Sequence, residues 1–158
     1  MPSNVRANIT ILIAEDDPDD RLIAEEAFQE CRVGVPLRFV ADGEEVMDYL
    51  HRRGRYAGVP GQPAPTPALI LLDLNMPRKD GWETLQEIKA DPDLRHIPVV
   101  VLTTSCAEED ILRSYRDGSN SFITKPASFD GMLELVRNLE KYWLETADLP
   151  PTGAGSGP

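Results

Sequence analysis

Residues 69–81 read LILLDLNMPRKDG, and this stretch decides the fold. The aliphatic run of residues 68–72 is typical of a strand that is buried on both faces in a parallel sheet. Asp73 follows the run directly, and a polar loop then leads to a helical pattern. A carboxylate at the end of a buried strand is costly to desolvate unless a cation or a ligand accompanies it. Asp73 is therefore the first candidate for a functional residue.

The same strand-then-helix pattern recurs on both sides of this stretch. Buried-type strands are predicted over residues 9–14, 37–41, 68–72, 99–102 and 121–124, and apolar residues at helical spacing follow each one. Because right-handed crossovers place helices on both faces of a parallel sheet, the pattern predicts an α/β fold. We expect a doubly wound five-stranded parallel sheet with five helices. In such sheets ligands bind beyond the carboxyl ends of the strands.

The first and last helices carry the clearest apolar faces. In the first helix, the residues that recur at helical spacing are Leu22, Ile23, Ala27 and Phe28. In the last helix, one apolar stripe predicts core packing by Met132, Leu135, Val136, Leu139, Tyr142 and Trp143. Asp42 with Glu45 resembles a capping box that opens the second helix.

The domain boundaries follow from composition. Residues 54–67 contain several glycines and prolines, which predicts an extended surface loop. Residues 1–8 are predicted to be an N-terminal tail, and residues 146–158 are rich in Pro, Gly and Ser without periodicity and are predicted to be disordered. One folded domain over residues 9–145 remains.

Length and charge exclude several classes of protein. The 158 residues suffice for one domain, and no apolar run approaches the roughly 20 residues that a membrane-spanning helix needs. The N-terminus lacks an export signal, so we expect a cytoplasmic protein. A net charge of -11 disfavours nucleic acid and anionic membranes as partners. Cys31 and Cys106 lie in no metal-binding or redox motif and are predicted to be free thiols.

Five polar residues end predicted strands and therefore meet at one edge of the sheet. They are Glu15, Asp16, Asp73, Thr103 and Lys125. Clustered carboxylates repel one another unless a cation lies among them, and hard oxygen ligands favour Mg²⁺. Asp73 can then act as a nucleophile toward phosphorus, with the ammonium and the hydroxyl stabilising the transferred group. We interpret the neighbouring Asp17, before Pro18, as a helix N-cap and not as a ligand.

The segments ILIAEDD, LILLDLNMPRKDG, VVVLTTS and FITKP resemble the receiver domain of bacterial response regulators over roughly residues 9–143. The resemblance implies a flavodoxin-like strand order, 2-1-3-4-5. It implies that Asp73 is the phospho-acceptor, and that Mg²⁺ or Mn²⁺ is bound by Glu15, Asp16, Asp73 and the backbone carbonyl of Asn75. It also implies the roles of phosphate-binding lysine for Lys125, switch hydroxyl for Thr103 and switch aromatic for Phe122. Glu15 stands where the family often has Asp.

The resemblance also implies partners. It predicts a single-domain response regulator that is phosphorylated by a sensor histidine kinase and catalyses only its own phosphorylation and dephosphorylation. The long loop before the third strand and the EDDPDD start are similar to response regulators paired with phytochromes. A homodimer through the face of the fourth helix, fifth strand and fifth helix is expected.

Three other functions are weighed against this one. A haloacid-dehalogenase-like phosphatase would need a second acid two residues after its nucleophile, where this chain has Asn75. A flavodoxin-like electron carrier would need a phosphate loop after the first strand, where this chain has acid. A phosphate-independent adaptor shares the fold, and labelling by acetyl phosphate distinguishes it from a receiver.

Overall fold

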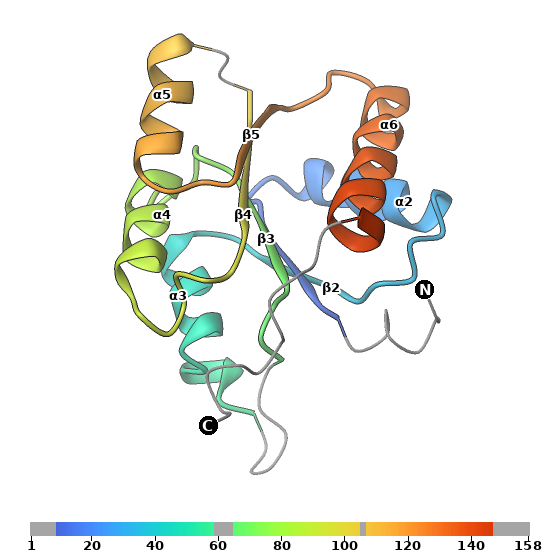
Figure 1. Ribbon diagram of the computed structural model, residues 1–158. Coiled ribbons are helices and arrows are strands. Elements are labelled where there is room, and N and C mark those ends of the chain that lie inside the picture. Colours follow the sequence, from blue (N-terminus) through green and yellow to red (C-terminus); the bar gives the residue numbers. More distant parts are fainter. Residues whose placement is uncertain (1–8, 59–64, 105–106, 147–158) are drawn as a thin grey trace.

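A five-stranded parallel sheet forms the centre of the structure, a computed structural model that describes residues 9–58, 65–104 and 107–146 (Figure 1). The strands lie in the order β2-β1-β3-β4-β5, which confirms the predicted topology. Their bounds are β1 Ile11–Ala14, β2 Leu37–Val40, β3 Leu69–Leu72, β4 Val99–Thr103 and β5 Ser121–Thr124.

Helices cover both faces of the sheet, as the alternating pattern predicts. Figure 1 shows α2 and α6 on one side and α3, α4 and α5 on the other. Within the described residues the α-helices are α2 Pro18–Glu30, α3 Gly43–Leu50, α4 Gly81–Ala90, α5 Glu108–Arg116 and α6 Phe129–Leu139. A π-helix, Glu140–Thr146, continues α6. None of the helices in the described ranges is long and apolar enough to cross a membrane.

Alternate residues of the strands build two separate cores. On β1, Ile11 and Ile13 pack with α2 and α6, whereas Leu12 and Ala14 pack with α3 and α4. The same alternation on β3 divides its four leucine and isoleucine side chains between the two cores. Because both faces are covered, β1 and β3 are buried at every position, which is why their sequences are continuously aliphatic.

The predicted helix caps are present. Asp17 is the N-cap of α2 and accepts hydrogen bonds from the backbone N–H groups of Asp19 and Asp20. The Asp42 side chain accepts from the Glu45 N–H at 2.8 Å, and the Glu45 carboxylate accepts from the Ala41 N–H. These bonds satisfy orphan donors of the first turns and fix where α2 and α3 begin.

Two of the predicted apolar faces are only partly buried. On α2, Ala27 and Phe28 are buried, but Leu22 is 53% exposed and Ile23 is 38% exposed, and Ile23 lines a cavity together with Phe129 and Met132 of α6. The stripe of the last helix is buried as far as Leu139. Tyr142 is exposed, which corrects its predicted core position, because the change from α- to π-helix at Glu140 shifts the angular phase of the stripe.

The remaining predictions concern loops, tails and thiols. Within residues 54–67, Gly54–Tyr56 forms one turn of 3-10 helix and not extended chain, and residues 59–64 lie outside the described residues. The predicted tails also lie outside them, except Thr146, which ends the π-helix. Cys31 is a free thiol, and Cys106 is not among the described residues.

Candidate functional site

The register of the sheet brings the strand ends together. Ala14 of β1 pairs with Leu72 of β3, so the residues that follow them, Glu15 and Asp73, emerge side by side. On β4 and β5, Thr103 pairs with Thr124, and the Lys125 N–H donates to the Thr103 carbonyl at 2.7 Å. Four strands therefore deliver polar residues to one edge of the sheet, as predicted for a parallel sheet of this order.

Three carboxylates at this edge could share one cation. Oxygen atoms of Glu15, Asp16 and Asp73 all lie within 4.8 Å of one another. Glu15 and Asp73 are buried, whereas Asp16 is exposed. Burial, together with the neighbouring Asp73 charge, raises the pKa of Glu15 from 4.5 to about 7. A divalent cation bound here would offset both the cost of burying the Glu15 charge and its repulsion by Asp73.

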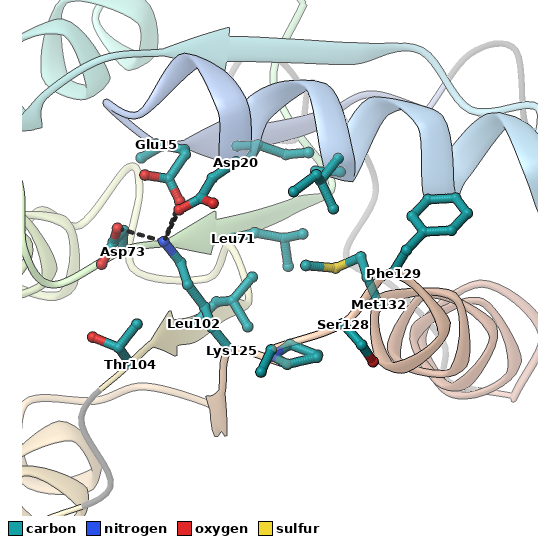
Figure 2. Close-up of a pocket in the computed structure, with 16 residues that line it drawn as sticks. Glu15, Asp20, Leu71, Asp73, Leu102, Thr104, Lys125, Ser128, Phe129 and Met132 are labelled. Atoms are coloured by element: carbon teal, nitrogen blue, oxygen red, sulfur yellow. Dashed lines mark hydrogen bonds and ion pairs between the residues drawn. The ribbon is translucent and has the colours of Figure 1, made fainter.

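Lys125 neutralises part of this negative charge. Its ammonium donates to Asp73 Oδ2 at 3.0 Å, to Asp20 Oδ2 at 3.2 Å and to Glu15 Oε1 (Figure 2). Burial alone would lower the pKa of Lys125, but the hydrogen bonds and charges of Glu15 and Asp73 outweigh it and raise that pKa. Lys125 therefore carries a permanent positive charge beside the Asp73 carboxylate.

Sequence reasoning missed Asp20. An acid in the first turn of α2 is explained well enough by the positive end of the helix dipole, so its type carries no distinct signal. Its position in the chain could have identified it, because α2 begins at Pro18, shortly after β1 ends at Ala14, so its first turn lies near the end of that strand. Figure 2 shows Asp20 on the α2 side of Lys125, with Glu15 and Asp73 beside it.

Asn75 and Thr103 lie next to Asp73. The Asn75 N–H donates to Asp73 Oδ1 at 3.0 Å, and the Asn75 side-chain amide donates to Thr103 Oγ1 at 3.4 Å. Thr103 is fully buried. Phe122 on β5 is partly buried against the core of α3 and α4. The structure thus groups Glu15, Asp16, Asp73, Asn75, Thr103 and Lys125 at one edge, and the roles of these residues and of Phe122 stay predictions.

The loop between β3 and α4 is tied to the start of α3. Arg78, at φ +63°, contacts the buried Asp42 carboxylate through Nε at 2.7 Å and Nη2 at 2.6 Å. The Gly43 N–H donates to the Lys79 carbonyl at 2.9 Å. Gly81 lets the end of the loop approach the strand, because a Cβ there would lie 2.3 Å from the Asp73 carbonyl oxygen. Asn75 is therefore held by a loop with fixed ends.

A cavity of about 340 Å³ adjoins the acidic edge between α2 and α6. Glu15, Asp20, Asp73 and Lys125 line its polar part (Figure 2). Its apolar part is lined by side chains that include Ile23, Leu71, Leu102, Phe129 and Met132. Thr104 also lines it and is exposed. The Asp73 carboxylate is thus reached from a site that combines acid, a fixed ammonium and an apolar wall.

Comparison with known proteins gives one consistent result. Residues 11–137 match the response regulator receiver domain family. The response regulator Rcp1 of Synechocystis sp. is 41% identical over 140 residues, which cover 89% of this chain and 92% of that protein. The crystal structure of RcpA, a phosphorylated cyanobacterial phytochrome response regulator, is 44% identical with a TM-score of 0.81 and covers 90% of this chain and 99% of that chain.

Two further solved structures are similar over the same length. The Mn²⁺-bound form of Rcp1 is 40% identical with a TM-score of 0.80. A response regulator in red light signalling of R. palustris is 40% identical with a TM-score of 0.84. Each comparison covers 90% of this chain and 99% of the other.

Proposed function

Because this chain belongs to the response regulator receiver domain family, we propose that it accepts a phosphoryl group on Asp73 from a sensor histidine kinase. Membership makes it a component of two-component signalling, in which a histidine kinase is the partner. Receiver domains bind a divalent metal ion, and the acidic cluster of this chain fits one. The acceptor residue, the identity of the metal and the particular kinase are the parts that we propose.

One observation carries the choice of Asp73. Its buried carboxylate has the Lys125 ammonium 3.0 Å from Oδ2 on one side and the Asn75 N–H 3.0 Å from Oδ1 on the other. In the proposed reaction a bond forms between an Asp73 oxygen and phosphorus while the bond from phosphorus to the kinase histidine nitrogen breaks. Lys125 then pairs with a phosphoryl oxygen, which lowers the charge that develops during transfer.

The metal that we propose is Mg²⁺, with Mn²⁺ as its substitute. Glu15, Asp16 and Asp73 supply carboxylate oxygens, and the Asn75 backbone carbonyl is proposed as a further ligand. All are hard oxygen donors, which suit these ions better than softer metals. The ion would neutralise the negative charge of the carboxylates and of one phosphoryl oxygen. The acidic side chains alone would repel the phosphoryl group.

We expect phosphorylation of Asp73 to change the conformations of Thr103 and Phe122. We propose that the Thr103 hydroxyl, now bonded by Asn75, turns to the phosphoryl group, and that Phe122 moves inward with it. Phosphorylation changes the equilibrium between the inactive and active arrangements only as far as the phosphoryl group binds the active arrangement better.

Leu112 and Tyr115 on α5 are 55% and 51% exposed. They support a homodimer through the α5–β5–α6 face, which phosphorylation would favour.

A phytochrome kinase is the donor that we propose first. The support is similarity, because a phosphorylated cyanobacterial phytochrome response regulator and one of red light signalling resemble this chain at 44% and 40% identity. We place the protein in the cytoplasm, where the kinase domains that phosphorylate receivers reside.

The experiment is phosphorylation of the full chain by acetyl phosphate with Mg²⁺, followed by intact mass. We expect one added phosphoryl group, lost without metal and lost in Asp73→Asn. Asp93→Asn is the matched control, because Asp93 is exposed and its backbone N–H bonds only within its own turn, away from the site. Metal-independent labelling, or labelling that survives Asp73→Asn, would contradict the proposal, and no labelling at all would favour a phosphate-independent adaptor.

A further inference from the structure

The Lys125 ammonium has three carboxylate partners, and they are not equivalent. It donates to Glu15, Asp73 and Asp20, one acceptor for each of its three protons. Glu15 and Asp73 belong to the cluster whose oxygens could share a cation. Among the described residues Asp20 does not belong to that cluster. The side chains of Glu15 and Asp73 are each 7% exposed, but that of Asp20 is 44% exposed.

This arrangement makes Lys125 a competitor for the metal ligands. When a divalent cation takes the oxygens of Glu15 and Asp73, the like charge of the ammonium is repelled and two of its partners become shared. Asp20 is the partner that stays available, because it lies on the side of Lys125 that faces α2 (Figure 2). Its backbone is fixed there by the Asp17 cap, whose Oδ1 accepts from the Asp20 N–H at 3.2 Å.

We propose that Asp20 is a positioning residue for Lys125: it holds the ammonium while a divalent ion occupies Glu15 and Asp73, and thereby strengthens metal binding. This inference rests on the proposed function only in taking the acidic cluster as the metal site. Without Asp20, Lys125 has only the metal ligands as carboxylate partners and competes with the ion for them. A residue in the first turn of α2, outside the set of proposed metal ligands, thus contributes to the metal affinity of this chain.

The test is Mn²⁺ binding by the full chain without any phosphodonor, with free Mn²⁺ measured by electron paramagnetic resonance. Asp20→Asn is expected to weaken binding about threefold, the size of effect that half-exposed charge pairs produce. Asp20→Glu keeps the carboxylate and should restore most of the affinity. Asp19→Asn is the matched control, because Asp19 is the neighbouring exposed acid in the same turn and its change removes the same charge.

A double-mutant cycle separates positioning from simple charge loss. In a Lys125→Met background no ammonium competes, so adding Asp20→Asn should leave the Mn²⁺ affinity unchanged within error. Equal weakening in both backgrounds, or equal weakening by Asp19→Asn, would show a general charge effect and overturn the inference. Unchanged affinity in Asp20→Asn would overturn it as well. Thermal unfolding in EDTA verifies that each variant is folded.

The outcome of the Mn²⁺ binding experiment does not depend on whether Asp73 is phosphorylated. Loss of labelling in Asp73→Asn with normal Mn²⁺ binding in Asp20→Asn would leave Asp73 as acceptor and remove Asp20 from its role. Weaker Mn²⁺ binding by Asp20→Asn, together with no labelling of the unaltered chain, would keep Asp20 as a positioning residue and remove Asp73 as the phospho-acceptor.

Discussion

The two sides of the acidic edge are built differently. On the side of α3 and α4, the loop after β3 is fixed by the Arg78–Asp42 ion pair and by the Gly43 N–H bond to Lys79. On the side of α2 and α6, a cavity of about 340 Å³ adjoins Lys125, and Phe129 at its wall is 40% exposed. We refer to these as the tied side and the open side.

The two sides meet two different requirements of a site that we propose is phosphorylated and dephosphorylated. The metal ligand proposed at Asn75 needs a backbone that does not move, and the tied side supplies a backbone hydrogen bond and an ion pair whose carboxylate is buried. The Lys125 ammonium must exchange carboxylate partners for a phosphoryl oxygen, and it is held only by side-chain carboxylates. We therefore expect substitutions on the tied side to change stability and those on the open side to change it little.

Matched glycine substitutions give the largest expected contrast. A Cβ on Gly43, on the tied side, would lie 2.1 Å from Thr84 Oγ1 and 2.6 Å from the Lys79 carbonyl oxygen, so the backbone must shift. We expect Gly43→Ala to lower the free energy of unfolding by about 3 kcal/mol. On the open side, a Cβ on Gly131 meets the Pro126 ring at 2.8 Å, and the helix propensity gained offsets part of this strain.

The measurement is urea unfolding of both variants in EDTA. Gly131→Ala should remain within about 1 kcal/mol of the unaltered chain. If Gly131→Ala proves as destabilising as Gly43→Ala, the two sides do not differ in the way that their contacts indicate.

Removing the charge of Glu15 should produce the next largest effect, and one that depends on pH. The pKa of Glu15 is raised to about 7 in the folded chain from 4.5, so the folded state binds more protons than the unfolded state between these values. The stability that the protonated carboxyl contributes is complete below pH 4.5 and is lost as pH rises through 7. Glu15→Gln stays neutral and should escape this loss.

Each pKa unit corresponds to about 1.4 kcal/mol, so the rise from 4.5 to about 7 corresponds to about 3.5 kcal/mol. Solvent at the adjoining cavity screens part of this, and we expect metal-free Glu15→Gln to be more stable than the unaltered chain at pH 8 by about 2 kcal/mol. At pH 4.5 the advantage should largely vanish. Urea unfolding at several pH values checks this. An advantage that is constant with pH would mean that Glu15 is ionised in the metal-free fold throughout this range.

The same contrast shows what the sequence could predict. The strand ends, and with them Glu15, Asp73 and Lys125, were predictable because a parallel sheet aligns its carboxyl ends whatever the packing of its helices. The caps of α2 and α3 were predictable because Asp17 and Asp42 act on backbone groups only a few residues away. These features depend on local pattern and on topology alone.

Features that depend on how helices pack were not predictable. An apolar pattern indicates which face of α2 can be buried, but it does not indicate which of those residues other elements cover, and Leu22 and Ile23 remain exposed. Asp20 and Lys125 are 105 residues apart in the chain, so no local pattern joins them. The phase change that exposes Tyr142 comes from π-helical bonding, which has no distinct pattern in this sequence.

The Arg78–Asp42 pair of the tied side should contribute a smaller but measurable stability. Asp42 is 3% exposed, so Arg78→Ala leaves a buried carboxylate without its guanidinium partner. We expect a loss of about 1 kcal/mol in the free energy of unfolding, less than for a fully buried pair because the Arg78 side chain is 63% exposed. Arg53→Ala, which breaks an ion pair with the half-exposed Asp48, is the control and should cost less than about 0.5 kcal/mol. Equal losses would mean that the tie to α3 is an ordinary surface contact.

The smallest effect is expected at Leu22, on the open side. Because Leu22 is 53% exposed, Leu22→Ala removes little buried area, and alanine is at least as favourable in a helix. The free energy of unfolding should change by less than about 0.5 kcal/mol in urea. A loss above about 1 kcal/mol would require that something covers this side in solution. Repeating the measurement at several protein concentrations would then distinguish a second copy of the chain, whose contribution rises with concentration, from a segment of the same chain, whose contribution does not.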